Sequence, residues 1–384
     1  MLFDPLESDP SISDLFISHA HYDHARGFEF PIQKKRSTED TREVYEAENN
    51  RQVGNWEQVR IGRRIKVGDV EVEAHEAGHI LGAVQYEIIT PEGTVVYASH
   101  LNLTDTLLLR AAEIAPCDLL VIETSVPTQK PLSQQSALAN IVKWTLECIR
   151  DERIPAFETD TIGNAQELVR AFNLWTKLPV IVHPRIARVN SVYERRGLGL
   201  RYTDASTEEA MRMIEKSHCV VLVPKRFDTS RYGNFRTAYV SASPIRARDT
   251  EREFFPLSDQ ADLNQLIQYV TEAKPKAVLT FYGSSEQFAQ MVTKRLGITA
   301  KQLATEVARR KPVSVKVDEQ RVSRCQAAIL RGMEIADFTY DKRDLVAFGL
   351  RESFRSTEID EALLRMTKNG TLKYSKLLDG YNRT

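Results

Sequence analysis

The feature that most constrains this chain is a cluster of three histidines and one aspartate in the pattern H-x-H-x-D-H, formed by His19, His21, Asp23 and His24. The whole sequence has only eight histidines. The cluster follows an apolar run, Leu15 to Ile17, which predicts a β-strand ending in a tight turn. Such a turn directs the polar side chains into one volume, where imidazole and carboxylate suit Zn²⁺, Mn²⁺ or Fe²⁺. We therefore predict a metal site; the alternative is a polar loop whose histidines form only caps and hydrogen bonds.

The H-x-H-x-D-H spacing after a strand resembles the second motif of the metallo-β-lactamase fold. Later segments resemble further motifs of that fold and of its β-CASP nuclease branch, in the branch's own order: Ala77–Ala83, Val121–Ser125, Pro256–Asp262 and Thr280–Gly283. The match covers roughly residues 1 to 300. The resemblance implies an α/β fold, namely the metallo-β-lactamase αβ/βα sandwich with an inserted parallel-sheet β-CASP domain.

Changes of pattern along the chain predict its domains. At 384 residues the sequence is long enough for two or three of them. After about residue 125, helical and apolar strand segments alternate, which is typical of a parallel sheet. We expect a metallo-β-lactamase domain made from residues 1–125 and 246–300, a β-CASP insertion at 126–245 and a C-terminal module at 301–384.

The C-terminal module is predicted to be a basic winged helix. Residues 301–384 carry 17 Lys and Arg against 12 Asp and Glu, a net +5, whereas the remainder of the chain is −6. Ser356 or Thr357 can cap a helix that Asn369-Gly370 ends, and a hairpin is expected to follow. A basic helix and hairpin favour contact with DNA or RNA, with a packing or dimerisation element as the alternative.

Overall composition excludes several classes of protein. The net charge of −1 means that any nucleic-acid site must be a local patch. The four cysteines form no C-x-x-C pair, which predicts reduced thiols and a cytoplasmic location. No apolar run approaches the roughly 18 residues that a membrane span needs, so no membrane partner is expected.

The chain departs from the β-CASP pattern at three positions. His100 stands where the family has an aspartate that bridges two metals, and one nitrogen lone pair cannot bridge in that way. Asp105 is the nearest acidic residue that could replace it. Gln260 replaces the motif B histidine, the family's general acid, and Tyr282 replaces the motif C histidine, a ligand of the second metal. All three changes affect the second metal and proton delivery.

The resemblance assigns a role to each candidate residue. Asp4 is expected to orient a metal ligand, and Asp23 with Glu123 to handle protons. The cofactor implied is zinc at two sites, the second of them altered, with manganese as the other option. The expected metal ligands are His19, His21, Asp23, His24, His79 and His100. Substrate contacts are expected from Gly163, Asn164, Gln260 and Tyr282.

Three functions remain open at the level of sequence. The first is a metal-dependent nuclease that hydrolyses RNA or single-stranded DNA through an atypical second metal site. The second is a catalytically impaired homologue that binds nucleic acid as a homodimer or pairs with an active nuclease subunit. The third is a metallo-hydrolase of another ester, because one fold hosts many chemistries. The retained histidine cluster favours the first.

Overall fold

The computed structural model describes residues 1–125, 133–227, 229, 234–242, 253–303, 319–333, 340–341, 345, 356–375 and 380–383. It divides into two compact units, Met1–Leu303 and Ala304–Thr384. The predicted domain boundaries at 125 and 245 adjoin or lie within segments outside the described residues, so they stay predictions. No helix in the described ranges has the length and apolarity needed to cross a bilayer.

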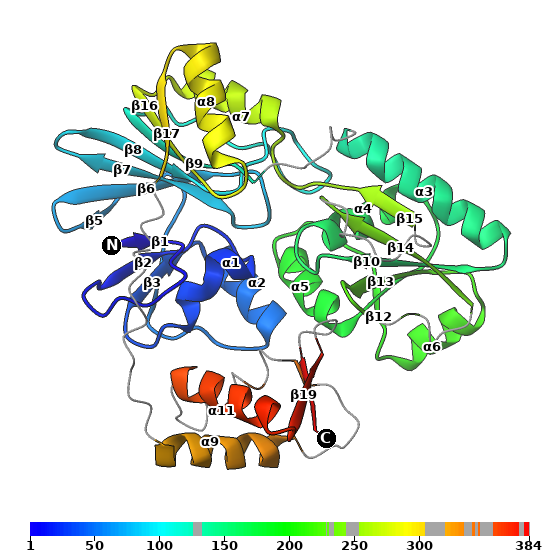
Figure 1. Ribbon diagram of the computed structural model, residues 1–384. Coiled ribbons are helices and arrows are strands. Elements are labelled where there is room, and N and C mark those ends of the chain that lie inside the picture. Colours follow the sequence, from blue (N-terminus) through cyan, green and yellow to red (C-terminus); the bar gives the residue numbers. More distant parts are fainter. Residues whose placement is uncertain are drawn as a thin grey trace. The chain divides into compact units, whose positions relative to one another are not determined.

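The first unit is built on two sheets that form the predicted sandwich (Figure 1). The larger sheet is mixed and has the order β17-β16-β9-β8-β7-β6-β5. Its strands are β5 (Ile65–Val67), β6 (Val70–Glu76), β7 (Val84–Thr90), β8 (Gly93–Ala98), β9 (Leu119–Glu123), β16 (Ala277–Phe281) and β17 (Thr299–Gln302). The smaller sheet is parallel and consists of β1 (Leu2–Phe3), β2 (Asp14–Phe16), β3 (Lys34–Ser37) and β4 (Trp56–Gln58).

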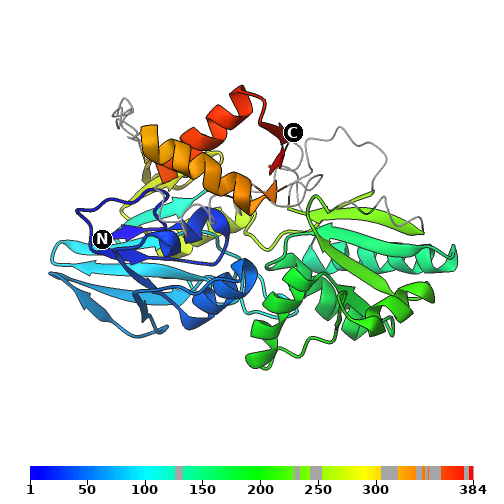
Figure 2. The same cartoon turned by 90° about the horizontal axis from the view of Figure 1, so that it is seen from below.

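A third sheet lies beside the sandwich and is parallel throughout, which confirms the predicted insertion (Figures 1 and 2). Buried β-branched residues suit strands that are covered on both faces. In spatial order the strands are β12 (Thr203–Asp204), β11 (Val180–Val182), β13 (Val220–Pro224), β10 (Ile154–Thr159), β14 (Phe235–Ser241) and β15 (Glu253–Pro256).

Helices cover these sheets and join the insertion to the sandwich. Their bounds are α1 (Tyr22–Ala25), the 3₁₀ turn η1 (Arg26–Glu29), α2 (Glu39–Asn49), α3 (Gln134–Arg150), α4 (Asn164–Trp175), α5 (Pro184–Arg195), α6 (Glu208–Glu215), α7 (Leu263–Ala273) and α8 (Ser285–Leu296). Helix α2 of the sandwich packs against α5 of the insertion, where Arg195 pairs with Glu43 at 3.0 Å. One apolar core runs through both parts, so the sandwich and the insertion pack as one unit.

The second unit has its own small core and the predicted order of helix and hairpin. Its elements are α9 (Glu319–Gly332), β18 (Tyr340–Asp341), α11 (Ser356–Lys368), β19 (Leu372–Ser375) and β20 (Gly380–Arg383). The three strands form an antiparallel sheet in the order β18-β20-β19. Ile359, Leu363 and Met366 lie on the buried face of α11, as their helical spacing predicts.

Candidate metal centre

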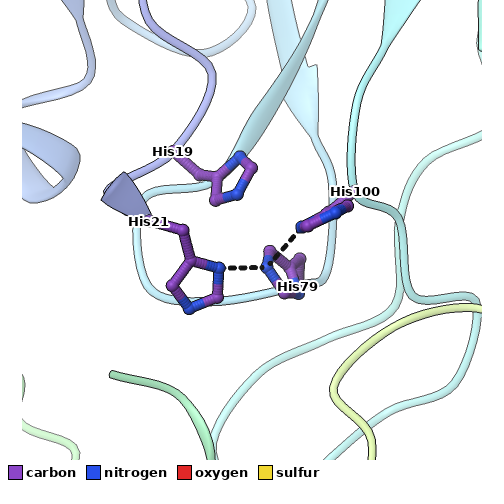
Figure 3. A group of neighbouring side chains, drawn as sticks. All are labelled: His19, His21, His79 and His100. Carbon is purple, nitrogen blue, oxygen red and sulfur yellow. Dashed lines mark hydrogen bonds between the residues drawn. The ribbon is translucent and has the colours of Figure 1, made fainter. Parts of the chain in front are cut away.

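Four histidines from three loops of the sandwich converge on one point (Figure 3). His19 and His21 follow strand β2, His79 lies in the turn between β6 and β7, and His100 follows β8. The Nε2 atom of His79 lies 3.0 Å from Nδ1 of His21 and 3.3 Å from Nδ1 of His100. One nitrogen of each ring lies within 4.8 Å of the other three. Four nitrogen donors at these separations can surround a single ion.

Hydrogen bonds on the far side of two of these rings fix which nitrogen faces the cluster. Nδ1 of His79 donates to the carbonyl of Asp259 at 2.9 Å, which leaves its Nε2 lone pair directed inward. The Ser18 hydroxyl donates to Asp4 at 2.6 Å and therefore accepts from Nδ1 of His19 at 2.9 Å. Nε2 of His19 is buried and has no hydrogen-bond partner among the described residues. Because a buried polar atom without a partner is costly, this nitrogen fits a metal ligand.

Burial keeps the imidazoles of His19, His21 and His79 neutral. It lowers the pKa of His19 and of His79 well below the usual value, and the neighbouring imidazoles lower both further. Burial and the nearby His100 likewise lower the pKa of His21 to about 4. Neutral imidazole is the form that binds a metal, so no proton has to leave these three rings near neutral pH.

A second group of donors lies on the other side of His100. Nε2 of His24 lies 3.5 Å from Oε2 of Glu123 and 3.7 Å from Oδ2 of Asp23, and like Nε2 of His19 it has no hydrogen-bond partner within the described ranges. Glu123 is buried, whereas the Asp23 side chain is 66% exposed at the opening of the site. Nε2 of His100 lies 3.0 Å from Oε1 of Glu123. The ring of His100 therefore contacts both groups of donors.

The charges in this second group favour a cation. Burial opposes ionisation of Glu123, but His100, His24 and the Ser125 hydroxyl outweigh it and lower the pKa of this carboxyl to about 2. Burial also opposes protonation of His24, yet the hydrogen bond and charge of Asp4, with Glu123, raise its pKa to about 9. Without metal this pocket therefore holds a proton on His24, and a divalent ion can take the proton's place.

Asp4 lies behind the histidines, in the position expected of an orienting residue. Its carboxylate accepts hydrogen bonds from the backbone N–H of Ser18 at 2.7 Å, from the Tyr97 hydroxyl at 3.1 Å and from Nδ1 of His24 at 3.0 Å. These bonds hold the segment after β2 in place. They also leave Nε2 of His24 directed at Glu123.

The two remaining departures from the family pattern lie at the rim. The amide nitrogen of Gln260 is 3.3 Å from Nδ1 of His100, so this side chain contacts the four-histidine cluster. Tyr282 is 40% exposed, has a left-handed backbone (φ 51°), and its ring centre lies 6.3 Å from that of His24. Asp105 accepts a hydrogen bond from the backbone N–H of Ala111 at 2.8 Å and belongs to no group of potential ligands in the described structure.

Gly163 and Asn164 lie where the insertion meets the sandwich. Gly163 has φ 86°, and a Cβ atom built on it would lie 2.4 Å from Oδ2 of Asp259. Asn164 is only 1% exposed, and its amide donates to the carbonyl of Leu257 at 3.4 Å. In this structure both residues lie behind Asp259, which in turn holds His79.

Sequence reasoning missed three residues that position the ligands: Ser18, Ser99 and Asp259. Ser99 donates to Oε2 of Glu123 at 3.1 Å and lies 3.1 Å from Nδ1 of His24. Burial and the charge of Asp160 raise the pKa of Asp259 to about 8. The sequence offered one clue to these three residues, since each of them directly precedes a position that the motifs identify.

Fold and site together define a protein of the metallo-β-lactamase type with an inserted parallel-sheet domain and a cluster of potential metal ligands. No protein-family model matches the chain. A solved structure, described as a protein of unknown function from Enterococcus faecalis V583, shares the fold with a TM-score of 0.54 at 16% identity, over 72% of this chain and 77% of that one.

Curated relatives place the chain more closely. It is 27% identical to a probable DNA ligase of Opitutus terrae, over 73% of this chain and 28% of the relative. It is 25% identical to cleavage and polyadenylation specificity factor subunit 3 of Dictyostelium discoideum, over 47% and 28%, and 24% identical to an RNase J-like protein of Methanocaldococcus jannaschii, over 49% and 51%. The chain thus spans about a quarter of the length of the first two and half of the third. These matches confirm the resemblance to the β-CASP nucleases of the metallo-β-lactamase fold.

Proposed function

We propose that this chain is a metal-dependent nuclease that hydrolyses phosphodiester bonds of RNA or single-stranded DNA. The observation that carries the proposal is the convergence of four imidazoles, two of them held on their far sides by hydrogen bonds, next to the ionised carboxylate of Glu123. The relatives described as RNase J-like and as a polyadenylation factor support a nucleic-acid substrate. The relative described as a probable DNA ligase supports testing DNA beside RNA, as a role in DNA repair requires.

The donor set fits a divalent ion. Zinc bonds of about 2.0–2.2 Å in tetrahedral geometry separate neighbouring ligand atoms by roughly 3.4 Å. The nitrogens of His21, His79 and His100 lie at 3.0 and 3.3 Å along the cluster, close to that separation. Imidazole donors favour zinc over manganese, so we assign zinc to His19, His21, His79 and His100. When bound, such an ion polarises a phosphoryl oxygen and acidifies a water.

The remaining side chains supply orientation and proton transfer. Asp4 and Asp259 hold the rings, while Glu123 and the exposed Asp23 are the ionisable oxygens beside the centre. Gln260 cannot give up a proton near neutral pH, so it serves as a hydrogen-bond donor to substrate and not as the acid for the leaving oxygen. Tyr282, exposed at the rim, offers an aromatic surface for a base. Gly163 and Asn164 act indirectly, by supporting Asp259, which holds His79.

The test is hydrolysis of end-labelled RNA and DNA, single- and double-stranded, by protein loaded with Zn²⁺ or Mn²⁺. His21→Ala is expected to reduce the rate by more than the ~10–100-fold that follows loss of even an outer partner of a metal ligand. His75→Ala is the matched control, because this half-buried histidine pairs with Glu87 at 2.7 Å outside the cluster. Equal residual activity in His21→Ala would trace the hydrolysis to a contaminant.

Absence of hydrolysis in the wild-type chain, together with salt-sensitive binding of nucleic acid, would instead support the impaired homologue. Such a protein would act as a homodimer or beside an active nuclease subunit. Binding through phosphate contacts weakens steeply as salt is raised. The cytoplasmic location and the winged helix's contact with nucleic acid remain predictions of the same proposal.

A further inference from the structure

His100 separates two groups of donors and contacts each with a different ring nitrogen. Its Nδ1 lies 3.3 Å from Nε2 of His79, on the side of the four-histidine cluster. Its Nε2 lies 3.0 Å from Oε1 of Glu123, on the side of His24. An aspartate here would offer two oxygens on one carbon atom, whereas the imidazole nitrogens face in different directions. Two ions on either side of this ring therefore need their own ligands.

The register of the large sheet explains how a carboxylate is still available to the second ion. Strands β8 and β9 are parallel and pair Ala98 with Ile122, so Glu123 lies on the neighbouring strand at the level of Ser99. This glutamate is buried, and Ser99, Ser125 and His100 contact its two oxygens at 2.7 to 3.1 Å. A side chain held at this many points has a fixed direction.

Separations in the second group also match those of ligands to one ion. Nε2 of His24 is 3.5 Å from Oε2 of Glu123, near the roughly 3.4 Å expected between ligands around a tetrahedral zinc, and His24, His100 and Glu123 each place one ligand atom within 4.8 Å of the other two. Nε2 of His24 is fully buried and has no hydrogen-bond partner in the described parts of the chain. An ion at this place would satisfy it.

We propose that Glu123 is a metal ligand, and that with Nε2 of His24 it holds a second cation on the far side of His100 from the four-histidine site. The proposal rests on the metal centre of the proposed function and gives Glu123 a role other than that of a proton-transfer group. A carboxylate beside an imidazole suits a harder ion than four imidazoles do. The second site therefore accepts Mn²⁺ as well as Zn²⁺ and releases its ion first.

The experiment is metal stoichiometry and affinity, measured by elemental analysis after dialysis and by calorimetric titration with Zn²⁺ and with Mn²⁺. The wild-type chain is expected to bind two zinc ions of unequal affinity. Glu123→Gln, which keeps the shape of the side chain, should retain the tight ion and weaken the second at least about 10-fold. His21→Ala should weaken the tight ion and retain the second. His75→Ala in each background corrects for weak binding at the surface group formed by Glu73, His75 and Glu87.

Folding of each variant is checked by circular dichroism in chelator, where neither site holds an ion. Should Glu123→Gln fail to fold, Glu123→Asp replaces it, and it should weaken the second ion alone. Two ions bound with unchanged affinities in Glu123→Gln, or only one in the wild type, would overturn the proposal.

Metal binding and hydrolysis are independent readouts of these variants. Loss of hydrolysis in Glu123→Gln with unaltered metal binding would identify Glu123 as a proton-transfer group, which leaves the nuclease standing and the second site refuted. If the wild-type chain bound two zinc ions of unequal affinity but hydrolysed no nucleic acid, the second site would stand and the nuclease would be refuted.

Discussion

Gly163→Ala is expected to destabilise the first unit and to disturb the metal centre from behind. Gly163 has φ 86°, a left-handed conformation that a residue with a Cβ atom adopts at a cost of about 1–2 kcal/mol. The added methyl would also lie 2.4 Å from Oδ2 of Asp259 and 2.9 Å from Cγ2 of Ile80. Overpacking of this kind costs about 1–3 kcal/mol. The two effects together amount to about 2–5 kcal/mol.

Gly197→Ala provides a matched control for the backbone part. Gly197 also lies in the insertion and has a similar φ of 77°, but a Cβ atom there would meet no heavy atom within 4 Å. Its substitution should therefore cost only the conformational part, about 1–2 kcal/mol. The difference between the two variants isolates the collision with Asp259.

Urea denaturation followed by tryptophan fluorescence measures this difference, and zinc titration measures its effect on the site. Because the carbonyl of Asp259 holds Nδ1 of His79, zinc affinity should fall about 10–100-fold in Gly163→Ala and stay unchanged in Gly197→Ala. If Gly163→Ala were no less stable than Gly197→Ala and bound zinc equally well, the proposed support of His79 from the insertion would be wrong.

Two further predictions concern charge and substrate contact. In protein stripped of metal, the raised pKa of His24, about 9, stabilises the fold by about 3 kcal/mol below pH ~6.5, and this is lost as the pH rises through 9. Asp4→Asn removes the main cause of the raised pKa of His24, so the free energy of unfolding should change less between pH 6.5 and 9. An unchanged dependence of this free energy on pH would contradict the role given to Asp4. Tyr282→Ala should weaken single-stranded nucleic-acid binding by about 1–3 kcal/mol while Tyr282→Phe retains it, as a stacking role requires and a hydroxyl-based role does not.

Local motifs predicted the architecture well because each one encodes a short-range pattern. The turn after β2 follows from the spacing of its polar residues, His79 follows from the resemblance of its motif to the family's, and the alternation of helices and strands gave the parallel insertion. The partner of His79 could not be predicted in the same way, since the Asp259 carbonyl lies 180 residues further along the chain. Only the tertiary fold brings the two together.

Residue roles were harder to predict than positions because burial decides them. Asn164 begins helix α4, as its sequence context indicates, but the fold encloses its side chain. The proximity of Glu123 to Ser99 and His100 depends on the pairing of β8 with β9, which neither motif contains. A chain read one motif at a time therefore shows which groups are present, but not which of them share an ion.

The departures at positions 100 and 260 are physically connected. The amide of Gln260 lies 3.3 Å from Nδ1 of His100, so a histidine at 260 would bring a fifth imidazole against the four of the cluster. Each buried neighbour already lowers the pKa of the others, and a further ring would have to stay neutral in order to fit. A neutral histidine at position 260 could not protonate a leaving oxygen. With histidine at position 100, a histidine at 260 would therefore have no advantage as a general acid. With an aspartate at 100 the opposite holds, because a carboxylate would raise the pKa of a histidine beside it. The two positions therefore form one chemical unit, in which Gln260 follows from His100.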